Sequence, residues 1–250
     1  MIFEGISRNS NGDFIFNWTD DEADDLMPLK FQKFNHVFKN RLGMDVYIAY
    51  KTRKHTDKED KNQIGDLQLY IKNDIASKDP KNYALFLAKA VMMFDKHYGL
   101  PAFDVICTPK SSSTLNTDIA KLMQRKAGSN TILATDVMVK NAVSNITINM
   151  DKLKGKDEST VKSVQNMLDK AISSGRFKMA DIFPKFRGLF QNFIVFNNKT
   201  DKRIFNSIVN GRILVIDDIL TRGTTLREMN RILMDLLPKE IVYFILFEKK

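Results

Sequence analysis

The stretch from Ile213 to Thr225 reads ILVIDDILTRGTT, and it decides how the rest of the chain is interpreted. Four apolar residues in a row are typical of a strand that is buried on both faces of a parallel sheet. We therefore expect the chain to leave the interior of a sheet at Asp217 and Asp218. Two adjacent carboxylates at a strand end are good acceptors for the vicinal hydroxyls of a ribose, directly or through a bound cation.

A turn rich in hydroxyl groups follows the two carboxylates. It comprises Thr221, Arg222, Gly223, Thr224 and Thr225 and leads into a helical pattern. Backbone N–H groups and hydroxyls at such a helix start converge on one anion. Gly223 permits close approach of the backbone, and Arg222 can add charge-assisted hydrogen bonds to a phosphate. The order of strand, acids, phosphate loop and helix predicts a pocket for a ribose 5-phosphate.

The flanking sequence predicts an α/β fold with a mostly parallel sheet covered by helices on both faces. Apolar strand patterns occur at 103–109, 131–143, 187–198, 211–218 and 240–249, and helical patterns lie between them at 118–128, 159–173 and 224–238. A further helix is expected over 81–98, before the first of these strands. Sheets of this kind bind ligands at the carboxyl ends of their strands.

The first 80 residues are expected to form an α+β elaboration of a core that spans residues 81–250. Their pattern predicts a strand pair about the turn 9–13, a helix over 29–42 and an antiparallel hairpin between 45–52 and 65–72. No Gly/Ser-rich or Pro-rich linker separates the two parts, so this boundary depends on pattern alone.

The composition excludes several classes of protein. The single cysteine, Cys107, rules out a disulfide scaffold and a cysteine-rich zinc module, and it is typical of a reducing compartment. Three histidines without ligand spacing give no support to a structural metal site. No apolar run approaches the ~18 residues of a membrane helix, and no signal-peptide pattern is visible. We therefore expect a cytoplasmic protein with no membrane partner.

The net charge of +9 is unevenly distributed along the chain. Residues 1–30 hold seven acids and two cations, a net charge of −5, so residues 31–250 carry +14. A basic surface of this size attracts anions. It leaves nucleic acid and phosphorylated small molecules as the two broad alternatives for a partner.

The stretch 213–225 resembles the 5-phosphoribosyl 1-pyrophosphate signature of the type I phosphoribosyltransferases. That signature has four apolar residues, two acids, two apolar residues, two small, hydroxyl or basic positions, a glycine, any residue and a Ser or Thr, and every position conforms. The Gly-Lys-Ser/Thr ending of a Walker A loop and the three glycines of a dinucleotide fingerprint are both missing. More weakly, the order of elements over 81–250 resembles the competence-associated branch of the family, although the cysteine-rich zinc segment that often precedes that branch is absent.

The resemblance implies a reaction and a set of site residues. Pyrophosphate would be displaced from C1 of the ribose by a nitrogen nucleophile, a nucleobase or an amine, with Mg²⁺ as the required metal. Asp217 and Asp218 would hold the ribose and, indirectly, the metal, while residues 221–225 would hold the 5-phosphate. The loop after the first core strand would bind the pyrophosphate through Lys110 and the serines that follow it, Ser111, Ser112 and Ser113.

Recognition of the nucleophile has to come from another part of the molecule. Only about 25 residues follow Thr225, too few for a carboxyl-terminal hood, meaning a segment that covers the site and recognises the base. The hood is expected from residues 1–80, from a long insertion at about 144–186, or from a partner chain, as in a homodimer. Within that insertion, the lysines of 152–156 together with Arg176 and Lys178 are as typical of a solvated surface as of a loop that closes over pyrophosphate.

Two functions of different class remain open at this point. The first is an active phosphoribosyltransferase. The second is a non-catalytic protein on the same fold, which senses 5-phosphoribosyl 1-pyrophosphate or a nucleotide, or binds nucleic acid through its basic surface. No general base can be identified in the sequence.

Overall fold

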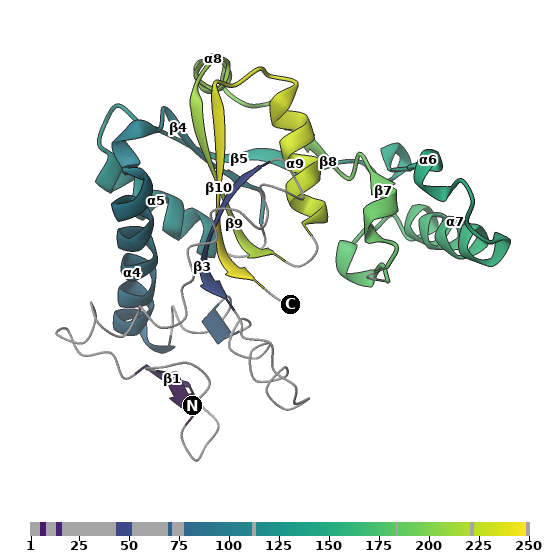
Figure 1. The fold of residues 1–250 in the computed structure, drawn as a ribbon, viewed down its shortest axis with the longest axis horizontal. Coiled ribbons are helices and arrows are strands. Elements are labelled where there is room, and N and C mark those ends of the chain that lie inside the picture. Colours follow the sequence, from purple (N-terminus) through teal and green to yellow (C-terminus); the bar gives the residue numbers. More distant parts are fainter. Residues whose placement is uncertain are drawn as a thin grey trace.

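A computed structural model describes residues 6–8, 14–16, 44–51, 70–71, 78–111, 114–183, 185–220 and 223–248. Its centre is a six-stranded sheet in the order β3–β10–β9–β4–β5–β8 (Figure 1). All neighbouring strands are parallel except β5 and β8, which are antiparallel. Helices flank this sheet, so the expected α/β architecture with a mostly parallel sheet is confirmed.

The elements of the core follow the apolar patterns of the sequence. The strands are β3 (Asp45–Lys51), β4 (Val105–Pro109), β5 (Ile132–Lys140), β8 (Ile194–Phe196), β9 (Arg212–Leu220) and β10 (Glu240–Glu248). The helices are α4 (Pro80–Tyr98), α5 (Leu115–Ala127), α8 (Lys202–Ile208) and α9 (Thr224–Met234), with a 3₁₀ turn, η1 (Leu100–Ala102), after α4. Local chemistry fixes the ends of α4, because the Asp79 side chain caps its first turn and Gly99 ends it at φ 70°.

Two hydrophobic clusters cover the two faces of the sheet. α4 and α5 pack on one face with Leu214 and Ile216 of β9, and α9 packs on the other with Ile213 and Val215. Figure 1 shows these helices on opposite sides of the strands. The four apolar residues of β9 are therefore buried on both faces, as the sequence predicts.

The connections around β4 and β9 create a topological switch point. The two strands are neighbours in the sheet. From β4 the chain passes through α5 to β5 on one side, and from β9 it passes through α9 to β10 on the other. Since the two connections leave in opposite directions, a crevice opens at the carboxyl ends of β4 and β9, where open α/β sheets bind ligands.

Residues 143–191 form an excursion between β5 and β8 that we call the insertion lobe. It contains η2 (Val143–Asn145), β6 (Thr147–Ile148), α6 (Met150–Leu153), α7 (Glu158–Ser173), η3 (Met179–Asp181), η4 (Arg187–Leu189) and β7 (Phe190–Gln191). β6 and β7 pair antiparallel at its base. Figure 1 shows α6, α7 and β7 projecting to one side of the sheet, beyond α9 and β8.

The expected antiparallel hairpin between 45–52 and 65–72 is wrong in its pairing. β3 lies beside β10 in parallel, with Val46 opposite Tyr243. The reason is burial of both faces, since Val46 and Ile48 enter one hydrophobic cluster and Ala49 enters the other. Of the second predicted strand, residues 70–71 are described, and they are helical. One strand of the first 80 residues thus belongs to the core sheet, while the boundary at residue 80 stays a prediction.

The strand expected over 187–198 is broken into two. Asn192 adopts a left-handed conformation, φ 59°, between β7 and β8, which separates the base of the insertion lobe from the edge of the core sheet. β8 then runs antiparallel to β5. An antiparallel edge strand on an otherwise parallel sheet is common in large sheets.

The N-terminal strand pair is confirmed, because β1 (Ile6–Arg8) pairs antiparallel with β2 (Phe14–Phe16). The helix expected over 29–42 lies outside the described residues. Within the part of the chain that the structure describes, no helix combines the length and the apolar character needed to cross a membrane.

Candidate functional site

A cavity of about 160 Å³ lies at the switch point, at the carboxyl ends of β4 and β9. Its polar wall comes from segments that are distant in the sequence: Lys110 and Ser111 after β4, Asn116 from α5, Asp217 from β9 and Thr225 from α9. The fold therefore brings the acidic strand end, the start of α9 and the loop after β4 together around one space.

Asp217 and Asp218 are almost fully buried in the C-terminal half of β9, which continues past the expected exit to Leu220, and 8% and 9% of their surface is exposed. The backbone N–H of Asp218 donates to Asp217 Oδ1 at 3.0 Å, and Asn116 Nδ2 approaches the same oxygen at 3.5 Å. Two adjacent buried carboxylates are costly unless hydrogen-bond donors or a cation compensate their charge. The position is therefore better suited to a polar ligand than to packing.

Asn116 completes this polar wall, and the sequence analysis missed it. It lies in the first turn of α5, is only 2% exposed, and its Oδ1 has no hydrogen-bond partner among the residues described. A buried acceptor without a donor costs about 1–3 kcal/mol, so a ligand that donates a hydrogen bond here is favoured. A sequence signal for Asn116 exists, because it is a polar residue on the otherwise apolar face that α5 buries with Leu115 and Ile119.

The start of α9 has the features of an anion site. Gly223 is buried and adopts φ 69°, a left-handed conformation that suits glycine. As the N-cap it has no side chain to satisfy the first N–H groups, and the first turn of α9 holds no acid. The hydroxyl Oγ1 of Thr224 is buried without a partner among the described residues. These donors can converge on a phosphate.

Two lysines line the cavity, one from the loop after β4 and one from the end of β5. The loop after β4 is held against β5 because the Lys110 N–H donates to the Met138 carbonyl at 2.8 Å. Lys140 reaches the same cavity from the end of β5. The register between β4 and β5 shifts between Ala134 and Met138, where Asp136 adopts φ 58°. The sequence analysis missed Lys140 because this irregularity changes which residues of β5 reach the cavity.

The structure groups some of the sequence-predicted residues and leaves others unassigned. Asp217, Lys110, Ser111 and Thr225 line one cavity, and Asp218, Gly223 and Thr224 adjoin these residues along the chain. The predicted residues Ser112, Ser113, Thr221 and Arg222 lie outside the described residues, so their roles stay predictions.

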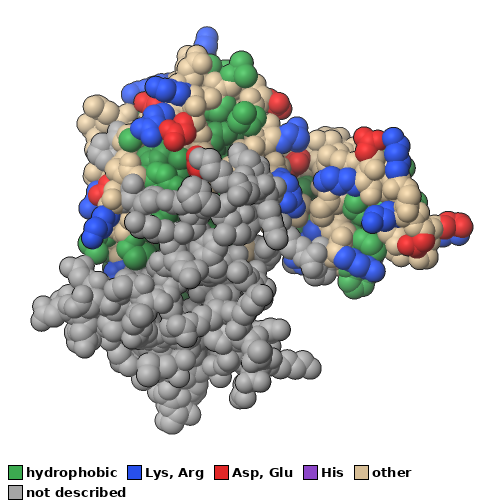
Figure 2. Space-filling model, in the orientation of Figure 1, with side chains coloured by type: hydrophobic (Ala, Val, Ile, Leu, Met, Phe, Trp, Pro, Cys, Tyr) green, Lys and Arg blue, Asp and Glu red, His purple; other side chains and the backbone are tan. Residues whose placement is uncertain are grey.

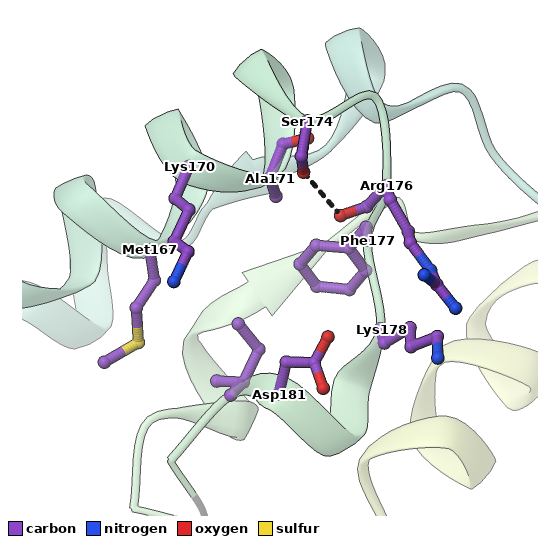
Figure 3. Close-up of a pocket in the computed structure, with 9 residues that line it drawn as sticks. Met167, Lys170, Ala171, Ser174, Arg176, Phe177, Lys178 and Asp181 are labelled. Carbon is purple, nitrogen blue, oxygen red and sulfur yellow. Dashed lines mark hydrogen bonds between the residues drawn. The ribbon is translucent and has the colours of Figure 1, made fainter.

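The cations of the insertion lobe do not line this cavity. Arg176 and Lys178 line a second cavity inside the lobe (Figure 3). Lys152 donates to the Gly188 carbonyl and Lys154 pairs with Asp151, both within the lobe. The lobe instead gives the core cavity an apolar residue, Met179.

The remaining wall of the core cavity is apolar. It is formed by residues that include Met138, Met179, Phe193 and Ile194. Burial raises the pKa of the nearby Cys107 thiol to about 12, so this group is neutral at physiological pH and is no nucleophile. The site is consequently suited to binding and charge stabilisation and offers no covalent chemistry through its cysteine.

Among the described residues, the charged oxygen ligands that this site offers a metal are the carboxylates of Asp217 and Asp218. No group of three or more His, Cys, Asp or Glu side chains suited to a metal occurs among the described residues. Asp217 and Asp218 are nevertheless hard oxygen donors, the type that Mg²⁺ prefers. They fit a Mg²⁺ ion that takes most of its ligands from a bound substrate and water.

Comparisons with known proteins find similarity among solved structures but not among family models or curated sequences. No family model matches the chain, and no curated protein is similar to it. Among solved structures, it is similar to a hypoxanthine phosphoribosyltransferase from Staphylococcus aureus, at 16% identity and a TM-score of 0.35. The match covers 66% of this chain and 61% of the other, less than two thirds of that protein's length. A similarity of this size assigns no activity to the chain.

Proposed function

We propose that this protein binds 5-phosphoribosyl 1-pyrophosphate at the carboxyl ends of β4 and β9 and transfers its phosphoribosyl group to a nitrogen nucleophile. The observation that supports this most is the single cavity at the switch point. It places the Asp217 carboxylate in the same space as the start of α9 and the Lys110 loop. A diol acceptor, a phosphate cradle and a basic loop are the three parts that this sugar phosphate requires.

The parts of the ligand are assigned by their chemistry. The ribose hydroxyls donate to the carboxylates of Asp217 and Asp218, and one of them also satisfies the buried Oδ1 of Asn116. The 5-phosphate accepts from the N–H groups and hydroxyls of residues 223–225. The pyrophosphate lies near Lys110 and Lys140, where two positive charges flank the cavity.

The reaction is a substitution at C1 of the ribose. The C1–O bond to pyrophosphate breaks, a C1–N bond forms, and the proton of the nucleophile leaves to solvent. Lys110 and Lys140 stabilise the negative charge that grows on the leaving pyrophosphate. Mg²⁺, when bound, would supply further neutralisation of that charge. The apolar wall of Met138 and Phe193 limits access of water, which would otherwise compete as nucleophile.

The nucleophile is a nucleobase or an amine, and it enters from the side of the insertion lobe. This direction is inferred from Met179, a residue of the lobe that lines the core cavity. The nearly apolar surface on that side suits a flat, weakly charged ring better than a carboxylate or a phosphate.

Release of pyrophosphate tests the proposal. Purified protein with Mg²⁺ and 5-phosphoribosyl 1-pyrophosphate is assayed against purines, pyrimidines, orotate, nicotinate and amines. Release with one acceptor that is lost in Lys110→Gln and in Asp217→Asn supports the transferase. Binding of the sugar phosphate without release by any acceptor supports the alternative, a non-catalytic sensor. Absence of binding contradicts both.

A further inference from the structure

A basic segment leads back from α7 to the base of the insertion lobe, and no step of the proposed reaction uses its cations. Residues 176–187 read RFKMADIFPKFR, with four Lys and Arg residues and one acid, a net charge of +3. The whole lobe holds nine Lys and Arg residues and five acids, a net charge of +4. Most of the positive excess of the lobe is therefore concentrated in this segment, where basic and aromatic residues are interleaved.

The charged ends of Arg176 and Lys178 lie on the outer side of this segment. Both side chains are exposed and leave the segment opposite the Phe177 ring, so they point away from the lobe cavity (Figure 3). Asp181, the acid of the segment, lies on the cavity side. Among the described residues, neither cation has an ion pair or a side-chain hydrogen bond. Two neighbouring positive charges of the lobe are thus left to an external anion.

These two cations extend toward α9. Figures 1 and 3 both show α9 beside the lobe, and Met179 lines the core cavity together with Thr225 of the first turn of α9. The exposed side of α9 adds Arg227 and Arg231, of which Arg231 is paired with Glu228. Figure 2 shows Lys and Arg side chains on the lobe and along the side of the core that faces it, so a polyanion is attracted to this side of the lobe from solution.

An exposed aromatic side chain follows on the same segment. Phe183 exposes 62% of its surface, although large apolar side chains are normally buried. Its ring meets the Phe186 ring edge-on, with centroids 6.4 Å apart, and Lys185 Nζ lies 4.6 Å from the centroid of Phe186. A Phe ring that is braced by a second ring and flanked by a cation suits a platform on which nucleobases stack.

The cations and the exposed ring are close enough to bind one short ligand. The Asp181 N–H donates to the Lys178 carbonyl at 3.0 Å, which closes a tight turn, and Phe183 follows two residues later. The Cα atoms of Lys178 and Phe183 are therefore within about 14 Å of each other. A strand of a few nucleotides spans this distance, with its phosphates on the cations and one base on the ring.

We infer that the segment 176–187 binds single-stranded nucleic acid, with Arg176 and Lys178 on the phosphates and a base stacked on Phe183. An acidic peptide would match the cations but would bring no planar ring with each charge. A membrane surface would require a continuous apolar patch. Of the exposed large apolar residues in the described part of the lobe, Met150 and Ile172 lie on α6 and α7, apart from Phe183 in the sequence. This interface does not depend on the proposed function.

Fluorescence anisotropy at a series of salt concentrations tests the phosphate contacts. The probe is a fluorescein-labelled oligothymidylate of about 12 nucleotides, within the range of known single-strand sites. The wild type should bind it saturably. In Arg176→Gln/Lys178→Gln the affinity at low salt should fall tenfold or more, and the slope of log affinity against log salt should decrease by about 1.4, since each phosphate contact contributes about 0.7. The matched control, Lys154→Gln/Lys162→Gln, removes the same charge from ion-paired positions of the same lobe and should keep the wild-type slope.

The stacking contact is tested separately. Phe183→Ala should weaken binding by about five- to hundredfold and leave the salt slope unchanged, because stacking on an aromatic ring involves no counterion. Met150→Ala is the control, since Met150 is 63% exposed elsewhere on the lobe. Circular dichroism establishes that each variant is folded before its affinity is compared.

Five results would overturn the inference. Absence of binding by the wild type would show that the segment is an ordinary solvated surface. Equal losses in the two double variants would show general attraction to positive charge only. Unchanged affinity in folded Phe183→Ala would remove the stacking contact. Tighter binding of a duplex of the same length would assign the surface to double-stranded nucleic acid. Tighter binding of polyglutamate or of phosphatidylserine vesicles would assign it to an acidic protein or to a membrane.

Discussion

Asn116 Nδ2 lies 3.5 Å from Asp217 Oδ1, which joins the first turn of α5 to the end of β9 across 101 positions of sequence. The contact spans the switch point of the sheet, where the chain leaves β4 and β9 in opposite directions. It orients the carboxylate that the proposed ribose site needs, while the Asn116 Oδ1 stays available to a ligand.

Replacement of Asn116 by alanine is expected to weaken binding of ribose 5-phosphate by about five- to hundredfold, because one acceptor and the donor to Asp217 are lost. Isothermal calorimetry measures the affinity, and Thr117→Ala, at the next position of α5, is the control. Wild-type protein should prefer ribose 5-phosphate to 2-deoxyribose 5-phosphate or to a 3-deoxy analogue, and the variant should lose that preference. An unchanged affinity and preference in a folded Asn116→Ala protein would remove this residue from the site.

Glu228 of α9 anchors the chain where it returns from the insertion lobe. Its buried carboxylate accepts from the Asn192 N–H at 2.6 Å and from Arg231 at 3.1 Å. Glu228→Ala should lower the free energy of unfolding by about 1–3 kcal/mol, since the Asn192 N–H loses its acceptor. Denaturant unfolding measures this change, and Asp235→Ala on the exposed end of the same helix provides a comparison. Equal stability of the two variants would contradict the anchoring role.

Gly211 is needed for steric reasons at the turn between α8 and β9. A Cβ atom at this position would overlap the Ser207 carbonyl oxygen, which belongs to the backbone and cannot move aside. Gly211→Ala should therefore destabilise the fold by about 1–3 kcal/mol, as overpacking does. Calorimetric melting should show a fall of a few degrees, whereas Gly188→Ala, where the added atom meets no neighbour within 4 Å, should stay close to wild type.

Cys107 makes stability depend on pH in the alkaline range. Burial raises its pKa from 9.0 to about 12, so the unfolded state ionises first as pH rises. The buried neutral thiol contributes to the free energy of unfolding in full below pH 9. This contribution is lost between pH 9 and 12, at about 1.4 kcal/mol per pH unit. Chemical denaturation at pH 9 and 10 should show this loss in the wild type and a smaller one in Cys107→Ala. The same slope in both proteins would contradict this assignment.

The sequence predicted the part of the fold that is specified by local pattern. The apolar run of β9, the helical repeat of α4 and the glycine after it were sufficient to place these elements. Pairing was less accessible, because β3 contacts β10 across almost 200 positions, and an apolar strand does not encode which neighbour it meets. The break at Asn192 escaped prediction because a single left-handed residue leaves no periodic signal.

The site residues divide in the same way, into those that a local pattern identifies and those that only the tertiary structure reveals. Asp217 and Thr225 were identified because both belong to one contiguous motif, 213–225. Asn116 and Lys140 enter the cavity only through the packing of α5 and the shifted register of β5, so they required the tertiary structure.

Binding of 5-phosphoribosyl 1-pyrophosphate tests the central claim most directly. Isothermal calorimetry with Mg²⁺ should show one-site binding to the wild type. The affinity should fall at least tenfold in Asp217→Asn/Asp218→Asn, since the ribose hydroxyls lose their charged acceptors. The lobe variant Arg176→Gln/Lys178→Gln should bind as the wild type does. Absence of heat with the wild type, or equal affinity in the aspartate variant, would contradict the proposal that this crevice holds a phosphoribosyl substrate.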